Sequence, residues 1–406
     1  MTRLGIIADD FTGATDVAGL AVRQGATASV VIGAQTASTD DAVVSALKIR
    51  TTTPDEAVRQ ALMAARQHLA EGRRLYWKYC STFDSTPRGN IGPVADALLD
   101  LTGADIAIHC PAFPENGRTV YKGRLFVGDL PLDESPMRDH PLTPMRDANL
   151  VRLLSPQVAG GVNLLTREGL LGETLPTVLA EARRLGHRHI IADALTNDDL
   201  AILADQAPGD ALLCGGSAFA AATIGASSAA GRSFRTPPGA IVVLSGSCSS
   251  ATRGQVAAWT GKRLDLTPEA LASEGHGPAL DWLERELPQG PVLVSATAEP
   301  ERLEQSQKVL GTDRAALLVE DAMSALAERA RDTGAAGIVV AGGETSGAVT
   351  RAIGADHLRI GPEVAPGVPV CLAIGSGRPI ALVLKSGNFG TTDFFATAVR
   401  MIEEMR

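Results

Sequence analysis

The chain opens with an apolar run, Leu4-Gly5-Ile6-Ile7-Ala8, that leads directly into the polar segment Asp9-Asp10-Phe11-Thr12-Gly13-Ala14-Thr15-Asp16. The run predicts a buried β-strand, and residues 13–24 predict an amphipathic helix. A strand followed at once by a helix is the repeating unit of a parallel sheet with helices packed on it. In such sheets ligands bind beyond the carboxyl ends of the strands, so the polar segment lies where a site is expected.

The alternation of apolar runs and helix-like segments continues along the first half of the chain. Further strands are predicted at residues 28–32, 43–49, 75–80, 105–109 and 189–193, and helices at residues 54–70, 91–101 and 177–185. Residues 111–155 contain six prolines and little periodicity. We therefore predict a long ordered loop there, and loops of that length in compact domains are usually functional.

A second α/β pattern follows a linker at residues 231–239 that is rich in arginine, proline and glycine. Its strands are predicted at residues 240–244, 291–295, 337–341, 368–374 and 380–385. We therefore predict an α/β protein with two domains, residues 1–234 and 235–406. Each is expected to be a mostly parallel sheet flanked by helices.

The composition limits the possible classes of protein. The chain has 406 residues, 45% hydrophobic and 20% charged, which is typical of globular proteins. A formal net charge of −9 argues against a broad nucleic-acid-binding surface. No apolar run reaches the roughly 20 residues of a membrane helix, and the N-terminus lacks the features of a signal peptide. Five scattered cysteines without a C-x-x-C pair indicate neither a disulfide framework nor a zinc site, so we expect a cytoplasmic protein.

Two adjacent carboxylates, Asp9 and Asp10, follow the first strand. One of them could serve only as the N-cap of the helix that comes next. A cap needs a single aspartate, however, so the pair favours a role in binding or orienting a hydroxyl group.

Two more polar segments follow predicted strands in the first half. One contains Asp84, Ser85 and Arg88, and the other contains Asn116 and Arg118. Aspartate and hydroxyl groups recognise a polyol, and arginine binds a carboxylate through two hydrogen bonds. Each segment alone would be typical of a solvated turn, but together they predict a site for a polyhydroxy acid.

The second half offers glycine-rich turns after three predicted strands: residues 245–249, 342–347 and 386–390. Glycine lets the backbone approach a phosphate, and free N–H groups at a helix start complete an anion site. Any one of these turns could equally be a tight turn without a ligand. No G-x-x-x-x-G-K-[ST] motif, complete G-x-G-x-x-G motif or G-x-S-x-G motif occurs.

The same segments, in the same order, resemble those of the four-carbon acid sugar kinases over nearly the whole chain. The resemblance rests on residues 7–16, 78–86, 116–121, 140–145, 245–249, 342–347 and 385–390. Within the family, residues 78–86 and 140–145 are most similar to the 3-oxo-tetronate kinases. The resemblance implies a sugar-acid-binding N-terminal domain and an ATP-binding C-terminal domain. It also implies an active site in the cleft between the two domains, where the γ-phosphate is transferred to the C4 hydroxyl. Mg²⁺ is expected because phosphoryl transfer depends on charge neutralisation.

On this resemblance we assign roles to residues as hypotheses. Asp10 accepts the proton of the C4 hydroxyl, with Asp9 and Asp16 as alternatives. The substrate is bound by Asp9, Asp84, Ser85, Arg88, Asn116 and Arg118, of which the two arginines hold its carboxylate. The nucleotide is bound by Ser245, Ser247, Gly342, Gly343, Glu344, Thr345, Gly387 and Asn388. No metal ligands are assigned.

Three alternatives stay open at this point. The substrate could be D-threonate or D-erythronate, which differ from 3-oxo-tetronate in oxidation level or at a stereocentre. The protein could be a nicotinamide-dependent sugar-acid dehydrogenase, although Ile380 stands where the dinucleotide motif begun at Gly375 needs its third glycine. It could also be a sugar-acid sensor without catalytic activity. A homodimer is compatible with the sequence, and no nucleic-acid or membrane partner is expected.

Overall fold

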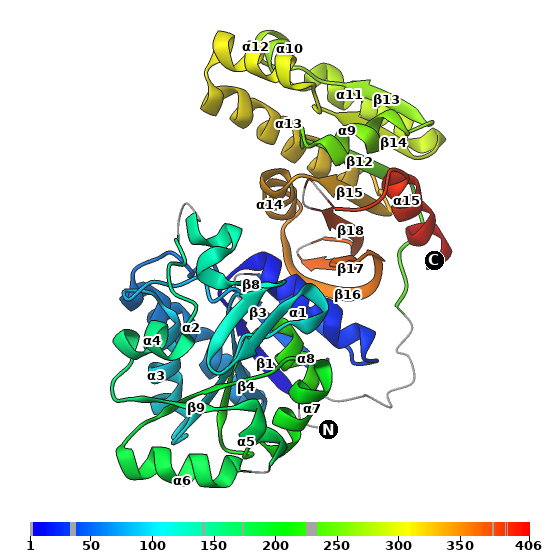
Figure 1. Ribbon diagram of the computed structural model, residues 1–406. Helices are drawn as coiled ribbons and strands as arrows, with labels where there is room; N and C mark the ends of the chain where they lie inside the picture. The colour runs from blue at the N-terminus through cyan, green and yellow to red at the C-terminus, as the bar shows by residue number, and fades with distance from the viewer. Residues whose placement is uncertain are drawn as a thin grey trace. The chain divides into compact units, whose positions relative to one another are not determined.

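The computed structural model describes residues 3–32, 38–139, 143–172, 174–224, 234–375, 377–385, 387 and 389–406. Contacts within the chain divide it into two compact units, Met1–Ala230 and Gly231–Arg406 (Figure 1). We refer to them as the N-terminal unit and the C-terminal unit. The prediction of two α/β domains is confirmed, while the limits 1–234 and 235–406 stay a prediction.

The N-terminal unit is built on a parallel sheet with the strand order β2-β3-β1-β4-β11-β5-β10-β9. Its strands are β1 (Leu4–Ala8), β2 (Ala28–Val31), β3 (Ala42–Ala46), β4 (Arg74–Lys78), β5 (Ala107–Cys110), β9 (Val162–Leu165), β10 (His189–Ala192) and β11 (Leu212–Gly215). Its helices are α1 (Phe11–Arg23), α2 (Pro54–Ala70), α3 (Ile91–Thr102), α4 (Leu150–Leu154), α5 (Arg167–Leu171), α6 (Leu175–Leu185), α7 (Asn197–Gln206) and α8 (Ser217–Ile224).

Helices cover both faces of this sheet. The connection from β1 to β2 and the connection from β3 to β4 run in opposite directions along the strand order. Because parallel crossovers are right-handed, α1 and α2 must lie on opposite faces. In Figure 1, α1 and α8 lie on one side of the strands, and α2 and α3 lie on the other. Strand β1 is buried along its whole length, as its apolar sequence predicts.

The prediction of a long loop at residues 111–155 is wrong. This segment forms a small antiparallel sheet of β6 (Arg118–Tyr121), β7 (Arg124–Val127) and β8 (Leu130–Pro131). It also contains the 3₁₀ helices Pro114–Asn116, Leu132–Glu134 and Pro136–Asp139 and the helix α4. The strands are too short to show a clear alternation. Lys122 and Gly123, which join β6 to β7, both have positive φ (49° and 70°), as a two-residue hairpin of type I′ requires.

The C-terminal unit has a sheet with the strand order β13-β14-β12-β15-β18-β17-β16, parallel from β13 to β18 and antiparallel beyond it. Its strands are β12 (Ile241–Ser245), β13 (Lys262–Asp265), β14 (Val292–Ser295), β15 (Gly337–Ala341), β16 (Ala355–Ala365), β17 (Val368–Gly375) and β18 (Ile380–Lys385). Its helices are α9 (Ser250–Ala257), α10 (Pro268–Glu274), α11 (Gly277–Glu286), α12 (Pro300–Leu310), α13 (Thr312–Asp332), α14 (Gly343–Ala352) and α15 (Phe394–Glu404), with a 3₁₀ turn at Leu287–Gln289.

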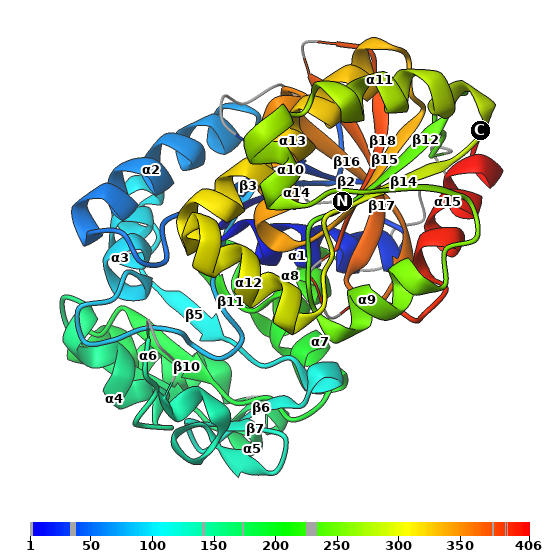
Figure 2. The ribbon, with the colours of Figure 1, turned by 90° about the horizontal axis from the view of Figure 1, so that it is seen from above.

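Two layers of helices enclose this second sheet. Figure 2 shows α11 and α13 on one side of the strands and α9 and α15 on the other. The apolar core joins strand residues such as Val243 and Val339 to Phe394 and Phe395 of α15. None of the described helices is both long and apolar enough to cross a membrane.

Candidate functional site

A cluster of charged side chains lies at the carboxyl ends of β1, β3 and β4. In the sheet register, Ala8 pairs with Ala46 on one side and with Lys78 on the other, so these three strands end at the same level. The cluster consists of side chains at or just beyond those ends, and we call it the strand-end cluster: Asp9, Asp10, Arg50, Lys78 and Asp84.

Arg50 is the centre of the strand-end cluster. Its Nε donates to Asp9 Oδ2 at 2.7 Å, and its Nη2 donates to Asp9 Oδ1 at 2.9 Å. Its guanidinium also lies 3.1 Å from Asp10 Oδ2 and 3.7 Å from Asp84 Oδ2. Burial raises the pKa of Asp9, and the hydrogen bonds and charge of Arg50 oppose that shift. Burial alone would lower the pKa of Arg50, but the carboxylate of Asp9 raises it above its ordinary value.

Arg50 was missed by the sequence analysis. The available signal was a basic residue directly after the strand predicted at residues 43–49. Its importance depends on β3 lying beside β1, which no local pattern reveals.

One of the two roles considered for Asp10, that of a helix cap, is present in the structure. It is the N-cap of α1, and its Oδ1 accepts a hydrogen bond from the backbone N–H of Gly13 at 2.8 Å. Its other oxygen faces Arg50. Asp9 is almost fully buried, whereas the side chain of Asp10 keeps 30% of its surface exposed, so Asp10 is the more accessible carboxylate. Asp16 lies further along α1 and is partly buried.

The loop after β4 brings Asp84 into the cluster through a strained backbone. Phe83 has a φ of 54°, which a bulky side chain rarely adopts, and its buried ring packs edge-on against Tyr79. Asp84 accepts a hydrogen bond from Thr82 Oγ1 at 2.5 Å. Strain of this kind persists only where the surroundings enforce it, and it concentrates at functional sites.

The other predicted residues of this loop differ in exposure. Ser85 is buried, and its hydroxyl donates to Gln157 Oε1 at 3.3 Å. Arg88 is exposed to solvent. The loop therefore carries an exposed cation, Arg88, four residues after the buried carboxylate of Asp84.

Asn116 and Arg118 belong to a different part of the unit. The neighbouring Glu115 pairs with Arg23 at 2.8 Å and accepts from Asn197 at 3.0 Å. Arg23 is the last residue of α1, roughly 20 Å along the helix from its start at about 1.5 Å per residue. The structure thus anchors this turn at the end of α1 that lies away from Asp10.

In the C-terminal unit, three turns meet at the carboxyl ends of β12, β15 and β18. The backbone N–H groups of Gly246 and Ser247 both donate to Ala341 O, at 3.0 and 3.1 Å. The N–H of Gly342 donates to Lys385 O at 3.0 Å, and Ser249 Oγ donates to Gly387 O at 2.6 Å. The glycine-rich segments predicted to hold phosphate are thus held together by hydrogen bonds.

The residues predicted to bind the nucleotide differ in solvent exposure. Gly343 and Glu344 are exposed at the start of α14, whereas Thr345 is buried. The hydroxyl of Ser245 is fully buried and hydrogen-bonded to Thr297, which leaves Ser247 as the more accessible serine. Asn388 lies outside the described residues.

Two glycines are required by the geometry of these turns. Gly342 has a φ of 128°. A Cβ on Gly387 would lie 2.6 Å from Ser247 Oγ and 3.0 Å from Ser249 Oγ. Larger side chains would therefore separate the turns or strain the backbone.

Lys385, at the end of β18, was also missed as a site residue. It is 1% exposed, and its Nζ donates to Thr252 Oγ1 at 3.0 Å and to Gly387 O at 2.9 Å. Burial lowers the pKa of its ammonium to about 8. Lys385 thus places a positive charge beside the three turns and ties one of them to α9.

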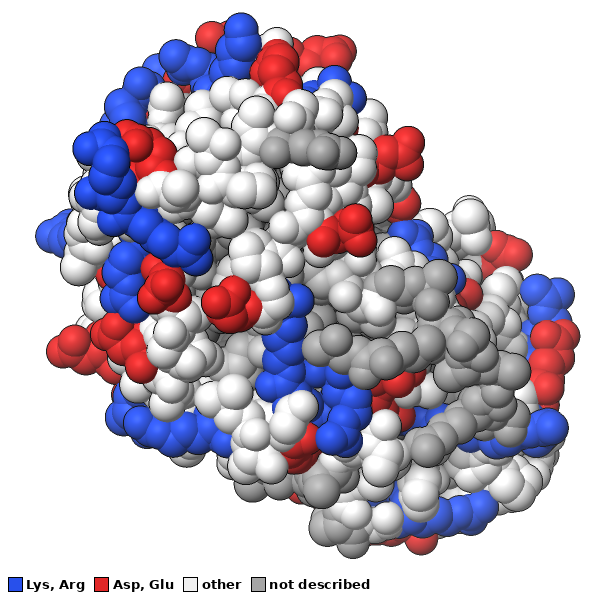
Figure 3. Space-filling model, turned by 90° about the horizontal axis from the view of Figure 1, so that it is seen from below, with Lys and Arg blue, Asp and Glu red and all other residues white. Residues whose placement is uncertain are grey.

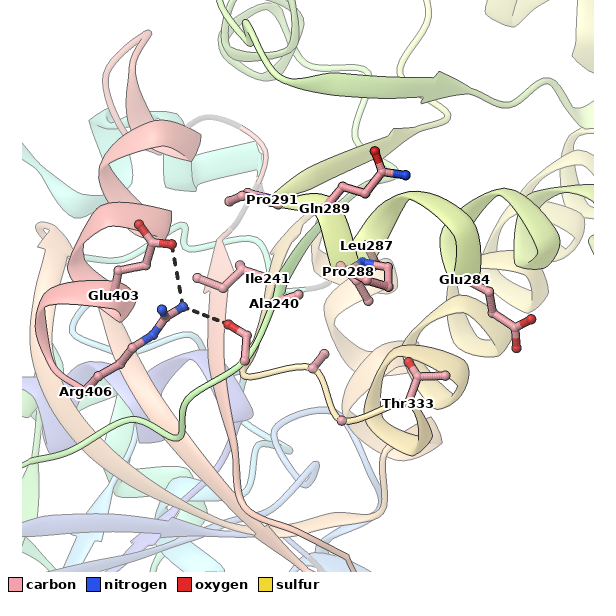
Figure 4. A pocket seen from close by; sticks show the side chains of 14 residues that line it. Ala240, Ile241, Glu284, Leu287, Pro288, Gln289, Pro291, Thr333, Glu403 and Arg406 are labelled. Atoms are coloured by element: carbon pink, nitrogen blue, oxygen red, sulfur yellow. Dashed lines mark hydrogen bonds and ion pairs between the residues drawn. The ribbon is translucent and has the colours of Figure 1, made fainter.

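A cavity of about 430 Å³ opens beside these turns. Gly246, Glu344 and Thr345 form part of its wall, and apolar residues of α12 and α13, including Leu303 and Val319, form another part. A second cavity, of about 530 Å³, lies at the amino ends of β12 and β14, next to Ala240 and Pro291 (Figure 4). Arg406 lines that cavity, where its Nη2 donates to Gly239 O at 2.7 Å and lies 3.5 Å from Glu403 Oε1. Of these two cavities, the first adjoins the glycine-rich turns.

The described residues contain no group of three or more histidine, cysteine, aspartate or glutamate side chains placed to hold a metal ion. Mg²⁺ does not require such a cage, because it is commonly bound by one or two carboxylates together with substrate phosphates and water. The exposed carboxylate of Glu344, beside the glycine-rich turns, fits that pattern.

On the face shown in Figure 3, basic and acidic side chains are interspersed.

Comparison with known proteins identifies the class to which this arrangement belongs. Residues 4–223 match the family model of a sugar-binding N-terminal domain, and residues 242–395 match that of a nucleotide-binding C-terminal domain. The chain belongs to the four-carbon acid sugar kinase family, as the resemblance predicted.

Individual relatives are similar to this chain over nearly its full length. The chain is similar to the 3-oxo-tetronate kinases of Burkholderia multivorans (46% identity, covering 98% of this chain and 97% of the relative) and Haemophilus influenzae (40% identity, covering 98% and 99%). It is also similar to the crystal structure of a Haemophilus influenzae protein, with a TM-score of 0.91 and 38% identity over 98% of this chain and 99% of that one. A Salmonella typhimurium structure matches with a TM-score of 0.88 and 37% identity over 99% and 100%.

Proposed function

We propose that this protein is an ATP-dependent kinase that phosphorylates the C4 hydroxyl of 3-oxo-tetronate. The relatives named 3-oxo-tetronate kinase support this substrate, because their similarity extends over both domains. The observation in the structure that carries the proposal is the grouping of Asp9, Asp10 and Asp84 around Arg50 in the sugar-binding domain.

The strand-end cluster suits a polyhydroxy acid. Ionised carboxylates accept hydrogen bonds only, so they recognise hydroxyl groups as donors. The bonds from Arg50 satisfy Asp9, while Asp10 keeps exposed surface. The substrate carboxylate needs a cation, and we propose Arg88 for it, because Arg88 is exposed and lies in the same loop as Asp84 and Ser85. Asn116 and Arg118 stay in the proposed substrate-binding set on the family resemblance alone, because the structure anchors their turn near the end of α1 that lies away from Asp10.

The glycine-rich turns suit a nucleotide. We propose that the backbone N–H groups at the start of α14 and the hydroxyl of Ser247 bind the phosphates. The apolar wall of the adjoining cavity would receive the base, since ligand pockets combine apolar walls with a few polar groups. Gly342, Gly387 and Thr345 shape this site, and Asn388 and Ser245 belong to it by the family resemblance.

In the proposed mechanism, Asp10 accepts the proton of the C4 hydroxyl as O4 attacks the γ-phosphorus of ATP. A loose transition state demands little early deprotonation, so a carboxylate is a sufficient proton acceptor. When bound, Mg²⁺ supplies charge neutralisation for the phosphates, and Glu344 is the residue that would hold it. The carboxylates of the strand-end cluster, which Arg50 holds in place, orient the acceptor.

The test is ADP formation by purified protein with ATP and Mg²⁺, measured in parallel against 3-oxo-tetronate, D-threonate and D-erythronate. We expect turnover with 3-oxo-tetronate to exceed that with either reduced acid. A preference for a reduced acid would overturn the substrate and keep the kinase. Reduction of NAD⁺ or NADP⁺ would indicate a dehydrogenase instead, and acid binding without any turnover would indicate a sensor.

Two further expectations belong to the same proposal. All five cysteines are free in the structure, which supports a reducing compartment such as the cytoplasm. A homodimer stays a prediction, and sedimentation of the purified protein would test it.

A further inference from the structure

The mechanism above leaves one charged residue of the strand-end cluster without a role. Lys78 is 4% exposed, and its Nζ makes no hydrogen bond or ion pair with any part of the chain that the structure describes. A lysine is rarely buried without a partner, because its ammonium carries three donors and a full charge. The Nζ atom is not among the fully buried polar atoms of the described residues, so the tip of this otherwise buried side chain is accessible and able to bind a ligand.

Lys78 Nζ lies beside Gly13, in the first turn of α1. A Cβ on Gly13 would lie 2.1 Å from Lys78 Nζ and 2.4 Å from Asp10 Oδ1. The two atoms are thus at most about 4.5 Å apart, the sum of those distances, and they do not form an ion pair within 4.0 Å. Glycine at position 13 leaves the space in which the ammonium and the carboxylate face each other.

That separation matches one bridging oxygen atom. Two hydrogen bonds of about 2.7–2.8 Å that meet near the tetrahedral angle place their outer atoms roughly 4.5 Å apart. The bridging group must accept a hydrogen bond from Lys78 and donate one to Asp10. A hydroxyl group does both, whereas a carboxylate or phosphate oxygen only accepts and would be repelled by Asp10.

We propose that Lys78 and Asp10 together bind the C4 hydroxyl of the substrate, and that Lys78 is a further catalytic residue. This inference rests on the proposed function. As O4 forms its bond to the γ-phosphorus, its proton passes to Asp10. The bond between the γ-phosphorus and the oxygen that joins it to the β-phosphorus of ATP breaks, and its electron pair leaves with ADP. Lys78 donates a hydrogen bond to O4 and offsets the negative charge that develops on it.

The test compares two ligands with two proteins. Wild-type protein and the variant Lys78→Met are titrated, without ATP, with 3-oxo-tetronate and with its 4-deoxy analogue, 2-hydroxy-3-oxobutanoate. We expect wild-type protein to bind the 4-hydroxy acid about 10- to 100-fold more tightly than the analogue, as for a hydrogen bond to a charged group. In Lys78→Met this ratio should fall toward one, while the affinity for the analogue changes less than about threefold.

Other outcomes would overturn the inference. An equal loss of affinity for both ligands would place Lys78 at the substrate carboxylate or in a structural role. An unchanged ratio would show that Lys78 does not contact O4. Failure of wild-type protein to form ADP with any of the acids would instead overturn the proposed function, so the two failures are distinguishable.

A second variant protects the test against misfolding of Lys78→Met. Gly13→Ala keeps the lysine but places a methyl group 2.1 Å from its Nζ and 2.4 Å from Asp10 Oδ1, so it disturbs both groups that are proposed to bind the hydroxyl. Because alanine favours helix more than glycine does, the variant should remain folded in a thermal melt. We expect it to lose turnover by about 100-fold and to show the same reduced discrimination between the two ligands, and retention of both would contradict the inference.

Discussion

Arg50 and Asp9 are joined by two parallel hydrogen bonds, at 2.7 and 2.9 Å, in which the guanidinium matches both carboxylate oxygens. Only 6% of the Asp9 side chain and 23% of the Arg50 side chain are exposed. This pair is a buried ion pair at the centre of the strand-end cluster. Removing one partner leaves the other charge buried without compensation.

Substitution of Arg50 should therefore destabilise the protein. We expect Arg50→Ala to lower the free energy of unfolding by about 3–5 kcal/mol, measured by urea denaturation. The matched control is Arg59→Ala, which removes an exposed arginine paired with Glu56 and should leave the urea midpoint nearly unchanged. Similar effects of the two variants would show that the Arg50–Asp9 pair contributes little.

Asp10 can be tested separately from its role as a helix cap. Asparagine caps helices as well as aspartate does, so Asp10→Asn should keep the bond to the Gly13 N–H and the stability of α1. It removes the proton acceptor, and we expect kcat to fall by about 10²–10⁴-fold with little change in the KM for ATP. Unchanged turnover, or equal losses in kcat and ATP affinity, would exclude Asp10 as the base.

Lys385 should make nucleotide binding sensitive to pH. Its pKa of about 8 means that the ammonium is charged at pH 7 and loses its proton as the pH rises through 8. Deprotonation removes a positive charge beside the glycine-rich turns, so the KM for ATP should rise between pH 7.5 and 9.5, by about tenfold for the loss of one such interaction. In Lys385→Arg the guanidinium stays charged throughout. The pH profile of that variant should be flat, and coincident profiles would contradict the prediction.

His68 should make stability depend on pH. Burial lowers its pKa to about 4, from about 6.5 when unfolded, so the folded state holds His68 neutral. This contribution is present above pH 6.5 and is lost as the pH falls toward 4, because only the unfolded state then binds the proton. Between pH 7 and pH 5 the loss is about 2 kcal/mol. His68→Gln does not titrate, so its unfolding free energy should fall less steeply over this range, and equal slopes would refute the prediction.

Neighbouring glycines at the start of α14 provide a matched pair of variants. Gly342 has a positive φ and lies against Thr345 and Ser247, whereas a Cβ on Gly343 would meet nothing within 4 Å. Gly342→Ala should cost about 1 kcal/mol or more in unfolding free energy and raise the KM for ATP at least tenfold. Gly343→Ala should leave stability unchanged. A stable Gly342→Ala variant with normal ATP affinity would show that this turn does not hold the phosphates.

Much of the fold could be predicted because it is encoded locally. Gly337–Ala341 and Ile380–Lys385 were predicted at their observed limits, since continuous apolar runs between turn residues mark the buried strands of a parallel sheet. Strand β16 was missed because Gly361 and Pro362 within it suggest a turn, and the register shifts near Ile360 and Glu363 accommodate them.

The sequence by itself determined the two α/β domains, the polar segments at the strand ends and the family to which the chain belongs. Each depends on residues close together in the chain, either as apolar periodicity or as a short motif. Only the tertiary structure decided that Arg50 and Lys78 join Asp9 and Asp10, and that Asn116 lies near the other end of α1. Those relationships depend on which strands are neighbours in the sheet. The order of strands in a sheet is set by packing between segments that are distant in sequence, so no local sequence pattern predicts it.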